Sequence, residues 1–378
     1  MDDAGRCVRI LYFSQSYTPH DHRFLEAASG FGHDVHYLML RDVGELEDRP
    51  IPSEIDILPS LSSRFPDRVI DFPSAYSSFS RTLTQVKPEL IHAGPVHGCA
   101  FLSAIKGGYP LVTMSWGSDI LLEATRGWKR RAAAYALKRS DVFICDCEAV
   151  KKAAVRLGVE EKRIVQFPWG VDLDKFHPIS NQHGQKSGPL DEDFVLLSTR
   201  TLEPLYGVDI IVEAFIVAAQ KELTLRLIML GNGSQRDSLE HRLAEAGLSE
   251  RAVFKGQVNY ENLPAYYQKS DLYVSASHSD GSSVSLLEAM ASGLPALVSD
   301  IPGNKEWVIP GENGWLFKDN EAGSLAEGLV SAVRSKSELA TLGASGRKMT
   351  ESRADWGKNK QLLEGAYQSA IRGIDGNG

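Results

Sequence analysis

The two residues whose types and spacing most suggest chemistry are the carboxylates Asp280 and Glu288. Asp280 opens a polar loop, residues 280–283, and Glu288 lies in the apolar run 284–292, which has the pattern of a helix. The first backbone N–H groups of a helix have no partner within the helix and suit a phosphate. A carboxylate part-way along the same helix suits a pair of sugar hydroxyls. The pattern therefore predicts a site for a nucleotide sugar or a dinucleotide.

One strand–helix–strand unit is expected to hold these carboxylates in place. An alternating apolar run at 272–276 precedes the polar loop, and a second apolar run at 296–299 follows the turn that ends the helix. In such a unit a ligand binds beyond the carboxyl end of the first strand, against the start of the helix. The polar loop and the helix start therefore lie where a ligand would bind.

Other strand ends in the same half of the chain carry residues suited to a diphosphate. Arg200 follows the apolar run 194–199 and could hold a diphosphate through two N–H groups, although an arginine that caps a helix on the surface would fit the same pattern. The run 230–234 contains glycines that allow a close backbone approach to a ligand, or that serve only a turn. Together with the residues after the run 252–255, these corners contribute Arg200, Gly231, Asn232, Gly233, Gln257 and Val258.

Composition describes a globular protein with room for two cores. The chain has 378 residues, of which 43% are hydrophobic and 24% charged. The net charge of −8 argues against non-specific nucleic-acid binding, so no nucleic-acid partner is expected. The acidic start of the sequence has neither the pattern of a signal peptide nor a long apolar span, which predicts a cytoplasmic protein that is at most peripheral to a membrane.

Strand-like and helix-like runs alternate along the chain and predict an α/β fold with mostly parallel sheets and helices on both faces. The polar stretch 178–193 contains Gly and Pro, has no period and reads as a linker between two domains. Besides the runs already given, strands are expected at 8–14, 34–40, 90–93, 111–115, 141–145, 164–167 and 225–230. Helices are expected near 23–30, 73–86, 98–105, 128–139, 149–157, 208–220, 235–246, 263–269, 321–333, 339–350 and 354–371.

The residues around Glu288 resemble a family signature. The run 288–295, EAMASGLP, preceded by Asp280, is similar to the acidic residue and the Glu-Ala-Met-Ala-x-Gly-x-Pro motif of the GT-B retaining glycosyltransferases of family four. Further matches are Gly-His-x-Val at 32–35, Gly-Val-Asp at 170–172 and Asn-Gly at 313–314, so the resemblance spans nearly the whole chain.

The resemblance implies a fold and a role for each of the two domains. It implies the GT-B fold, in which two doubly wound Rossmann-like domains enclose a cleft and a C-terminal helix crosses back to the first domain. Residues 1–178 would form the acceptor-side domain together with the helix 354–371, and residues 179–353 would bind the nucleotide-sugar donor.

The resemblance also implies roles in donor binding. Glu288 would hold the ribose hydroxyls, Asp280 would contact the donor sugar, and Arg200 would neutralise the leaving diphosphate. The loop 231–234 would line the diphosphate pocket, and Gln257 and Val258 would meet the base through their backbone. The loop residues Gly281 and Ser283, with Val284 and Ser285 at the helix start, would bring backbone amides to the phosphates.

Three positions depart from the family pattern. Tyr206 stands where a lysine usually supplies a second cation, so it joins the donor site without bringing a charge. The first carboxylate is Asp280 rather than the more frequent Glu. Trp116 replaces a histidine that often faces the acceptor, which leaves Asp119 as the nearest candidate for a catalytic group, with a helix N-cap as the alternative.

The acceptor side is expected to involve Trp116, His97 and His20, all in first-domain loops. Trp116 could instead pack at the domain junction, and the histidines could be ordinary loop residues. The segment 126–139 is rich in Lys and Arg and could dock on an anionic membrane surface at the inner membrane face, or form a solvated helix face.

The resemblance thus implies a retaining, metal-independent hexosyltransferase in polysaccharide or glycoconjugate biosynthesis. It would need no cofactor and would use a UDP- or GDP-linked sugar as co-substrate and a glycan or lipid-linked acceptor. Two alternatives stay open. Tyr206 and Trp116 could mark a non-catalytic sugar-nucleotide-binding subunit of a glycosyltransferase complex. The same fold could also carry a nucleotide-sugar epimerase.

Overall fold

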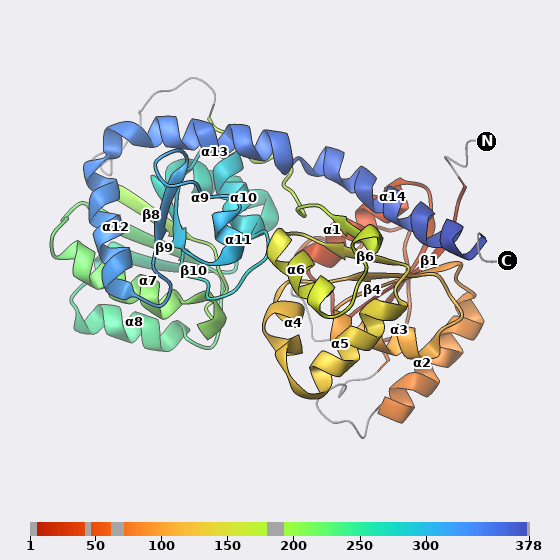
Figure 1. Cartoon of the computed structure of the whole chain (residues 1–378). Helices are drawn as coiled ribbons and strands as arrows, with labels where there is room; N and C mark the ends of the chain where they lie inside the picture. Colours follow the sequence, from red (N-terminus) through yellow and green to blue (C-terminus); the bar gives the residue numbers. More distant parts are fainter. Residues whose placement is uncertain (1–5, 42–46, 62–71, 180–192, 376–378) are drawn as a thin grey trace. The chain divides into compact units, whose positions relative to one another are not determined.

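The computed structural model describes residues 6–41, 47–61, 72–179 and 193–375, with side chains described as far as Gly373. It divides the chain into two units (Figure 1). Unit 1 comprises Met1–Pro168 and Gly357–Gly378, and unit 2 comprises Trp169–Trp356. Most of the linker expected at 178–193 lies outside the described residues.

The chain passes into unit 2 at Trp169, earlier than the boundary at 178 that the sequence suggested. The segment before residue 178 places Val171 and Phe176 in the second core. Val171 forms a bridge with Asp355, and the ring of Phe176 lies 5.8 Å from that of Tyr267. The composition of the polar stretch could not show this, because the packing partners lie far along the sequence.

Unit 1 is built on a parallel sheet with the strand order β3-β2-β1-β4-β5-β6-β7. Its strands are β1 (Arg9–Ser14), β2 (Asp34–Met39), β3 (Asp56–Ile57), β4 (Leu90–Ala93), β5 (Leu111–Met114), β6 (Val142–Cys145) and β7 (Ile164–Gln166). Its helices are α1 (Pro19–Gly30), α2 (Phe72–Val86), the π turn η2 (Val96–Ala100), α3 (Phe101–Lys106), α4 (Ser118–Leu121), α5 (Gly127–Arg139), α6 (Glu148–Arg156) and α14 (Trp356–Asp375).

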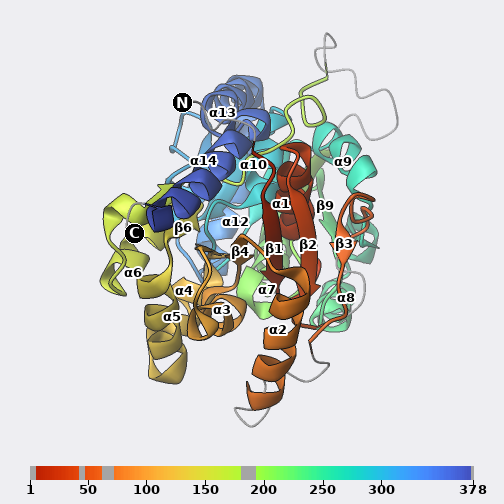
Figure 2. The same ribbon diagram turned by 90° about the vertical axis from the view of Figure 1, so that its right-hand side faces the viewer.

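Side chains that alternate along β1 build the two faces of this sheet. Phe13 stacks on Phe79 of α2, with ring centroids 5.0 Å apart, whereas Tyr12 points to the opposite face and meets the ring of His92 at 4.9 Å. On that face His92 Nδ1 lies 2.8 Å from the hydroxyl of Tyr367, which anchors α14 to unit 1. Figure 2 shows α1 and α14 on one side of the sheet and α2 and α3 on the other. The expected return of the C-terminal helix to the first unit is confirmed.

Unit 2 is built on a second parallel sheet, with the order β10-β9-β8-β11-β12-β13. Its strands are β8 (Phe194–Ser198), β9 (Leu225–Leu230), β10 (Ala252–Gly256), β11 (Leu272–Ser275), β12 (Ala296–Ser299) and β13 (Gly314–Phe317). Its helices are the short turn η5 (Pro204–Tyr206), α7 (Val208–Ala219), α8 (Arg236–Glu245), α9 (Leu263–Lys269), α10 (Val284–Ala291), α11 (Pro302–Lys305), α12 (Ala322–Arg334) and α13 (Leu339–Arg353).

Both faces of the second sheet are covered. Leu196 faces a core formed with α7, α8 and α12, whereas its neighbour Leu197 faces a core formed with α9, α10 and α13. Figure 1 shows α7 and α8 on one side of the strands and α9 and α10 on the other. Both sheets are therefore doubly wound, as the alternation of apolar runs predicts.

The strand orders determine where ligands can bind. In unit 2 the winding reverses between β8 and β11, which are direct neighbours, and in unit 1 it reverses between β1 and β4. Ligands of doubly wound sheets bind beyond the carboxyl ends of the strands at such a reversal. In unit 2 these ends lead into the segments that carry Arg200 and Asp280, and in unit 1 into the segments that carry Tyr17 and His97. The fold thus brings the predicted site residues of unit 2 to one edge of its sheet.

Candidate active site

Arg200 lies just beyond the carboxyl end of β8, within a ring of polar side chains. Its Nη1 donates hydrogen bonds to Ser283 Oγ at 2.8 Å and to Ser285 Oγ at 3.1 Å. Its Nη2 lies 2.7 Å from Asp280 Oδ2, and its guanidinium carbon lies 4.2 Å from the centroid of the Tyr206 ring. The structure thus joins four predicted donor-site residues around one guanidinium.

Electrostatics keep this guanidinium charged although it is largely buried. The side chains of Arg200 and Asp280 are only 12% and 19% exposed. Burial by itself lowers the pKa of Arg200, but the Asp280 carboxylate and the neighbouring tyrosine hydroxyls outweigh it, so that the pKa lies above its usual value. The site therefore presents a permanent cation at the start of α10.

The Arg200–Asp280 ion pair is close but poorly directed. Among the described residues, Asp280 Oδ2 accepts no aligned hydrogen bond and the buried Nε of Arg200 has no acceptor. Charge rather than hydrogen-bond geometry therefore holds this pair. An incoming anion with several oxygens could satisfy both the charge and the unused N–H group.

A glycine allows Tyr206 to reach Arg200. Gly207 ends η5 with φ at +57°, and a Cβ atom there would collide with the carbonyl oxygen of Ala276, just after β11. Only glycine lets this turn lie against the end of β11 in a left-handed conformation. The turn in turn places the aromatic ring of Tyr206 over the guanidinium.

Glu288 is buried in α10 and receives a hydrogen bond from a tyrosine that the sequence analysis did not single out. The hydroxyl of Tyr267, in α9, donates to Glu288 Oε2 at 2.9 Å. The same hydroxyl lies 3.1 Å from Thr199 Oγ1, and the hydroxyl of Tyr273 lies 2.8 Å from Ser285 Oγ. A second layer of hydroxyl groups thus supports both Glu288 and the serines that hold Arg200. The tyrosines occupy apolar positions in their elements, and the sequence gives no sign of these bonds.

The glycine corner after β9 packs directly against the Arg200 segment. Gly231 has φ at +98° and donates its N–H to the carbonyl oxygen of Gly256 at 2.7 Å. A Cβ atom on Gly233 would collide with the carbonyl oxygen of Leu202. The N–H of Leu202 in turn donates to the carbonyl oxygen of Asn232 at 2.9 Å. The close packing of this corner against the backbone of residues 200–202 therefore requires glycine at 231 and 233.

The remaining predicted donor residues lie at the same edge of the sheet. Gln257 is exposed and Val258 is half-buried, directly after β10. Gly281 is buried, and its N–H donates to Asp280 Oδ1 at 3.0 Å. Val284 is the first residue of α10. The predicted donor residues of unit 2 are thus distributed over the ends of β8, β9, β10 and β11.

In unit 1, Asp119 is buried and ties two strand ends together. Its Oδ2 accepts the N–H of Val96 at 2.8 Å, and its Oδ1 accepts Ser115 Oγ–H at 2.6 Å and the N–H of Trp116 at 3.1 Å. Burial raises its pKa despite these hydrogen bonds. The N-cap of α4 is Gly117, so the helix-cap alternative for Asp119 is wrong. The geometry gives Asp119 an organising position between the loops after β4 and β5.

His97, Trp116 and His20, the predicted acceptor-side residues, lie in this part of unit 1. The rings of His20 and Trp116 are 6.4 Å apart. His97 Nε2 lies 3.3 Å from Glu123 Oε2, and this contact, followed by the one from Lys129, lowers the pKa of Glu123 to about 2. In the described part of the chain, His97 Nδ1 and Trp116 Nε1 are buried without hydrogen-bond partners. Two unused polar atoms therefore lie near the carboxyl ends of β4 and β5.

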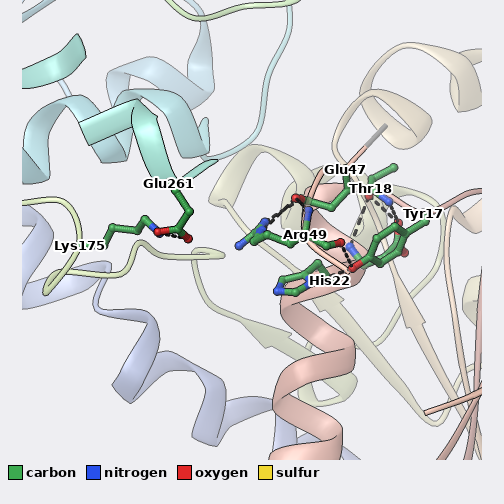
Figure 3. A network of polar contacts seen from close by, with 8 residues as sticks. Tyr17, Thr18, His22, Glu47, Arg49, Lys175 and Glu261 are labelled. Carbon is green, nitrogen blue, oxygen red and sulfur yellow. Dashed lines mark hydrogen bonds and ion pairs between the residues drawn. The ribbon is translucent and has the colours of Figure 1, made fainter. Parts of the chain in front are cut away.

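A further polar network follows β1 and was not anticipated. The hydroxyl of Tyr17 lies 2.7 Å from His22 Nδ1 and donates to the Arg49 carbonyl at 3.0 Å, while Arg49 forms a two-point contact with Glu47 (Figure 3). Figure 3 also shows the separate Lys175–Glu261 pair of unit 2. The sequence offers no spacing that would connect Tyr17 to Arg49.

Within residues 6–41, 47–61, 72–179 and 193–375, no group of three or more His, Cys, Asp or Glu side chains could hold a metal ion. None of the helices in these ranges is both long and apolar enough to cross a membrane.

Comparison with known proteins identifies the class. A family model described as Glycosyltransferase Family 4 matches residues 20–175, and one described as Glycosyl transferases group 1 matches residues 180–349. An uncharacterised glycosyltransferase of Methanocaldococcus jannaschii is 25% identical over 321 residues, which are 84% of this chain and 76% of the relative. The mannosylfructose-phosphate synthase of Agrobacterium fabrum is 31% identical over 152 residues, 38% of this chain and 34% of the relative.

Solved structures show the same fold at low identity. HepE of Anabaena in complex with UDP and glucose matches with a TM-score of 0.80 at 19% identity, over 96% of this chain and 100% of that chain. The sucrose-phosphate synthase of Thermosynechococcus elongatus gives a TM-score of 0.78 at 19% identity, over 97% and 100%. These likenesses define the fold as GT-B. With the two family models, the chain belongs to the family four glycosyltransferases, as its motifs indicated.

Proposed function

We propose that this protein transfers a sugar from a nucleoside diphosphate sugar to an acceptor hydroxyl with retention of configuration at the anomeric carbon. The observation that carries the proposal is the position of Arg200. A charged, largely buried guanidinium stands at the winding reversal of unit 2, bonded to two serines at the start of α10, with Glu288 on the same helix.

Each group at this edge has a proposed task in donor binding. Glu288 would accept hydrogen bonds from the ribose hydroxyls, and the backbone N–H groups of residues 283–285 would meet the phosphates at the helix start. Arg200 would exchange its contact with Asp280 for the diphosphate, and Asp280 would turn to the donor sugar. The loop 231–234, Gln257 and Val258 would border the diphosphate and the base.

The proposed reaction is a substitution on one face of the sugar. The bond from the anomeric carbon to the diphosphate oxygen breaks, and the acceptor oxygen forms the new bond on the same face. The acceptor proton passes to the leaving phosphate oxygen, so no protein base is needed. Arg200 would stabilise the negative charge that grows on the diphosphate, without a metal ion. In this scheme Asp119 organises the loops that carry Trp116 and Val96 rather than moving a proton.

The acceptor would be met by unit 1, through His20, His97 and Trp116. Its class is suggested only by relatives, among them a lipopolysaccharide core biosynthesis mannosyltransferase of Rhizobium meliloti and an alpha-monoglucosyldiacylglycerol synthase of Streptococcus pneumoniae. One name refers to lipopolysaccharide core biosynthesis and the other to a glucosylated lipid, and both support our proposal of polysaccharide or glycoconjugate assembly with a glycan or lipid-linked acceptor. The complex of HepE with UDP favours a UDP-linked donor, with GDP as the alternative.

An exposed face of α5 supports a proposed membrane contact. Trp128 is 48% exposed and Tyr135 37% exposed, and the guanidinium of Arg139 lies over the Tyr135 ring. Each cation near an anionic bilayer contributes about 1 kcal/mol. We propose that this face brings a cytoplasmic enzyme to the inner membrane surface. The exposed cations beside these aromatic residues are Arg126, Arg130, Arg131, Lys138 and Arg139.

Nucleotide release and product stereochemistry test the proposal. Purified protein is incubated with UDP- and GDP-sugars and simple glycosides, the freed nucleotide is measured, and the anomeric configuration of the product is read by proton NMR. Release of nucleotide with a product of unchanged configuration supports the proposal. Binding of a nucleotide sugar without release would favour the binding-subunit alternative, which Tyr206 motivates because it brings no charge. Release of a changed donor sugar without transfer would favour an epimerase.

A further inference from the structure

We propose that Tyr267 is a positioning residue, whose hydroxyl holds the carboxylate of Glu288 in the orientation that receives the ribose of the donor. This inference rests on the proposed function, because it assigns the supporting partner of the ribose-binding group. Tyr267 lies in α9, and no sequence motif pointed to it.

The ring of Tyr267 is fixed, so its hydroxyl has little freedom. The side chain is fully buried, and its ring lies 5.8 Å from that of Phe176 and 6.3 Å from that of Tyr273. Rotation of such a ring would need space that a close-packed core lacks. The hydroxyl oxygen is therefore held at a constant place beside Glu288.

The direction of the hydrogen bonds follows from the number of protons. A phenol has one O–H group to donate, and two acceptors lie within reach: Glu288 Oε2 at 2.9 Å and the Ser285 carbonyl at 3.3 Å. The carboxylate is the closer acceptor, and bonds to charged groups are the stronger ones. The proton therefore goes to Glu288, and Thr199 Oγ1, 3.1 Å away, donates to the phenol oxygen. A relay of donors runs from Thr199 through Tyr267 to Glu288.

This donor persists at any working pH. Burial, followed by the charge of Glu288, raises the pKa of Tyr267 well above its usual value. The phenol thus keeps its proton and continues to hold the carboxylate.

The Tyr267 hydroxyl sets the orientation of the Glu288 carboxylate rather than its charge. A glutamate that binds two neighbouring ribose hydroxyls must present its carboxylate in one orientation, although its side chain has three torsions. A buried donor on one oxygen removes that freedom before the ligand arrives. Without the Tyr267 hydroxyl, Glu288 would keep its charge but lose the donor that orients its Oε2, so the ribose contacts would weaken while the phosphate contacts remain.

The test compares nucleotides that differ only at the ribose. UDP, GDP and ADP and their 2′-deoxy forms are titrated into the purified full chain by calorimetry, and the ratio of the two dissociation constants is taken for each base. For the nucleotide that binds, we expect the wild type to prefer the ribose form by roughly tenfold, as the loss of a hydrogen bond to a charged group predicts. Tyr267→Phe should reduce this ratio to within about threefold of unity.

Tyr273→Phe is the matched control. It removes the hydroxyl of an equally buried tyrosine from the same core, but that hydroxyl contacts Ser285 rather than Glu288. The control should weaken ribose and deoxyribose forms alike and keep their ratio. A second variant, Thr199→Val, removes the donor to the phenol oxygen and leaves the ring in place, so the ratio should fall partly.

If Tyr267→Phe keeps the wild-type ratio while both affinities fall together, the residue is merely structural and the positioning role is overturned. If both Thr199→Val and Tyr267→Phe keep the wild-type ratio, the positioning role is likewise overturned. If Tyr267→Phe folds poorly, an unchanged ratio in Thr199→Val alone overturns it. If no nucleoside diphosphate binds the wild type, the proposed function fails, and this inference fails with it.

Discussion

Replacement of Asp280 by Asn is expected to tighten the binding of a nucleoside diphosphate while it slows sugar transfer. In the structure Asp280 is the charged partner of Arg200, at 2.7 Å. A diphosphate must displace it. The variant removes the competitor and leaves the two serine contacts of Arg200 intact. Free nucleotide has no sugar for Asp280 to bind, so it gains from the change, whereas the complete donor loses a sugar contact.

The size of the effect follows from the charges. At about 4 Å and an effective dielectric near 20, two unit charges attract by about 4 kcal/mol. Most of this attraction is offset because the pair has lost water and lacks an aligned hydrogen bond, as the unsatisfied Asp280 Oδ2 indicates. We therefore expect a gain of about 1–2 kcal/mol in nucleotide binding, roughly a tenfold lower Kd. The melting temperature without nucleotide should fall, because a buried cation loses its partner.

Calorimetric titration with UDP and GDP measures the first effect, and nucleotide release from the UDP- or GDP-sugar measures the second. Asp271→Asn is a matched control, because Asp271 lies at the opposite, amino end of β11, where its Oδ2 accepts the Val195 N–H at 2.7 Å. The control should leave the Kd unchanged. A weaker or unchanged Kd in Asp280→Asn would refute the reasoning that Asp280 occupies the place of the diphosphate.

Tyr206→Lys should lower the Kd for a nucleoside diphosphate several-fold in the same titration, because it adds a second cation beside Arg200; an unchanged Kd would mean that residue 206 does not reach the phosphates. Gly207→Ala should lower the free energy of unfolding, measured by urea titration, by more than about 2 kcal/mol. The new Cβ would collide with the Ala276 carbonyl, and alanine is strained in the left-handed backbone conformation of this residue. Gly247→Ala, where φ is +70° but nothing lies within 4 Å, should lower the same free energy by only about 1 kcal/mol, and equal losses would contradict the collision. Burial raises the pKa of Asp21 to about 6 from an ordinary value of 3.8, so the folded state binds the proton more tightly than the unfolded chain. Its contribution to stability should therefore fall as pH rises from about 4 to 6, and relative to Asp21→Asn the wild type should lose up to about 3 kcal/mol across that window. Urea unfolding of both proteins at several pH values measures the difference, and parallel curves would contradict the assignment.

Sequence reasoning recovers the long elements because their apolar periods are local. It also recovers the meeting of Arg200 with Asp280, because both follow strands whose parallel carboxyl ends share one edge of the sheet. β3 and β13 were not expected as strands, since short segments such as Asp56–Ile57 acquire their form only by pairing with a neighbour. The start of α1 was expected too late, although Thr18 and Asp21 form a capping box that was present in the sequence.

The supporting contacts of the site could not be predicted in this way. The stacking of Tyr206 on Arg200 depends on how Gly207 turns against β11, and the bond from Tyr267 to Glu288 depends on how α9 packs against α10. Both are tertiary contacts between elements whose own patterns are only apolar. Residue types and strand ends therefore locate the site, whereas the second layer of hydroxyl groups becomes visible only in the folded chain.

The most direct test of the central claim is a thermal-shift panel of UDP-, GDP- and ADP-sugars on the wild type and on Glu288→Ala. We expect one nucleotide class to raise the melting temperature of the wild type and to raise that of the variant much less, because the ribose loses its partner on α10 while the phosphate contacts remain. An equal shift in both proteins would contradict the placement of the donor at Glu288. No shift in either protein would contradict donor binding itself.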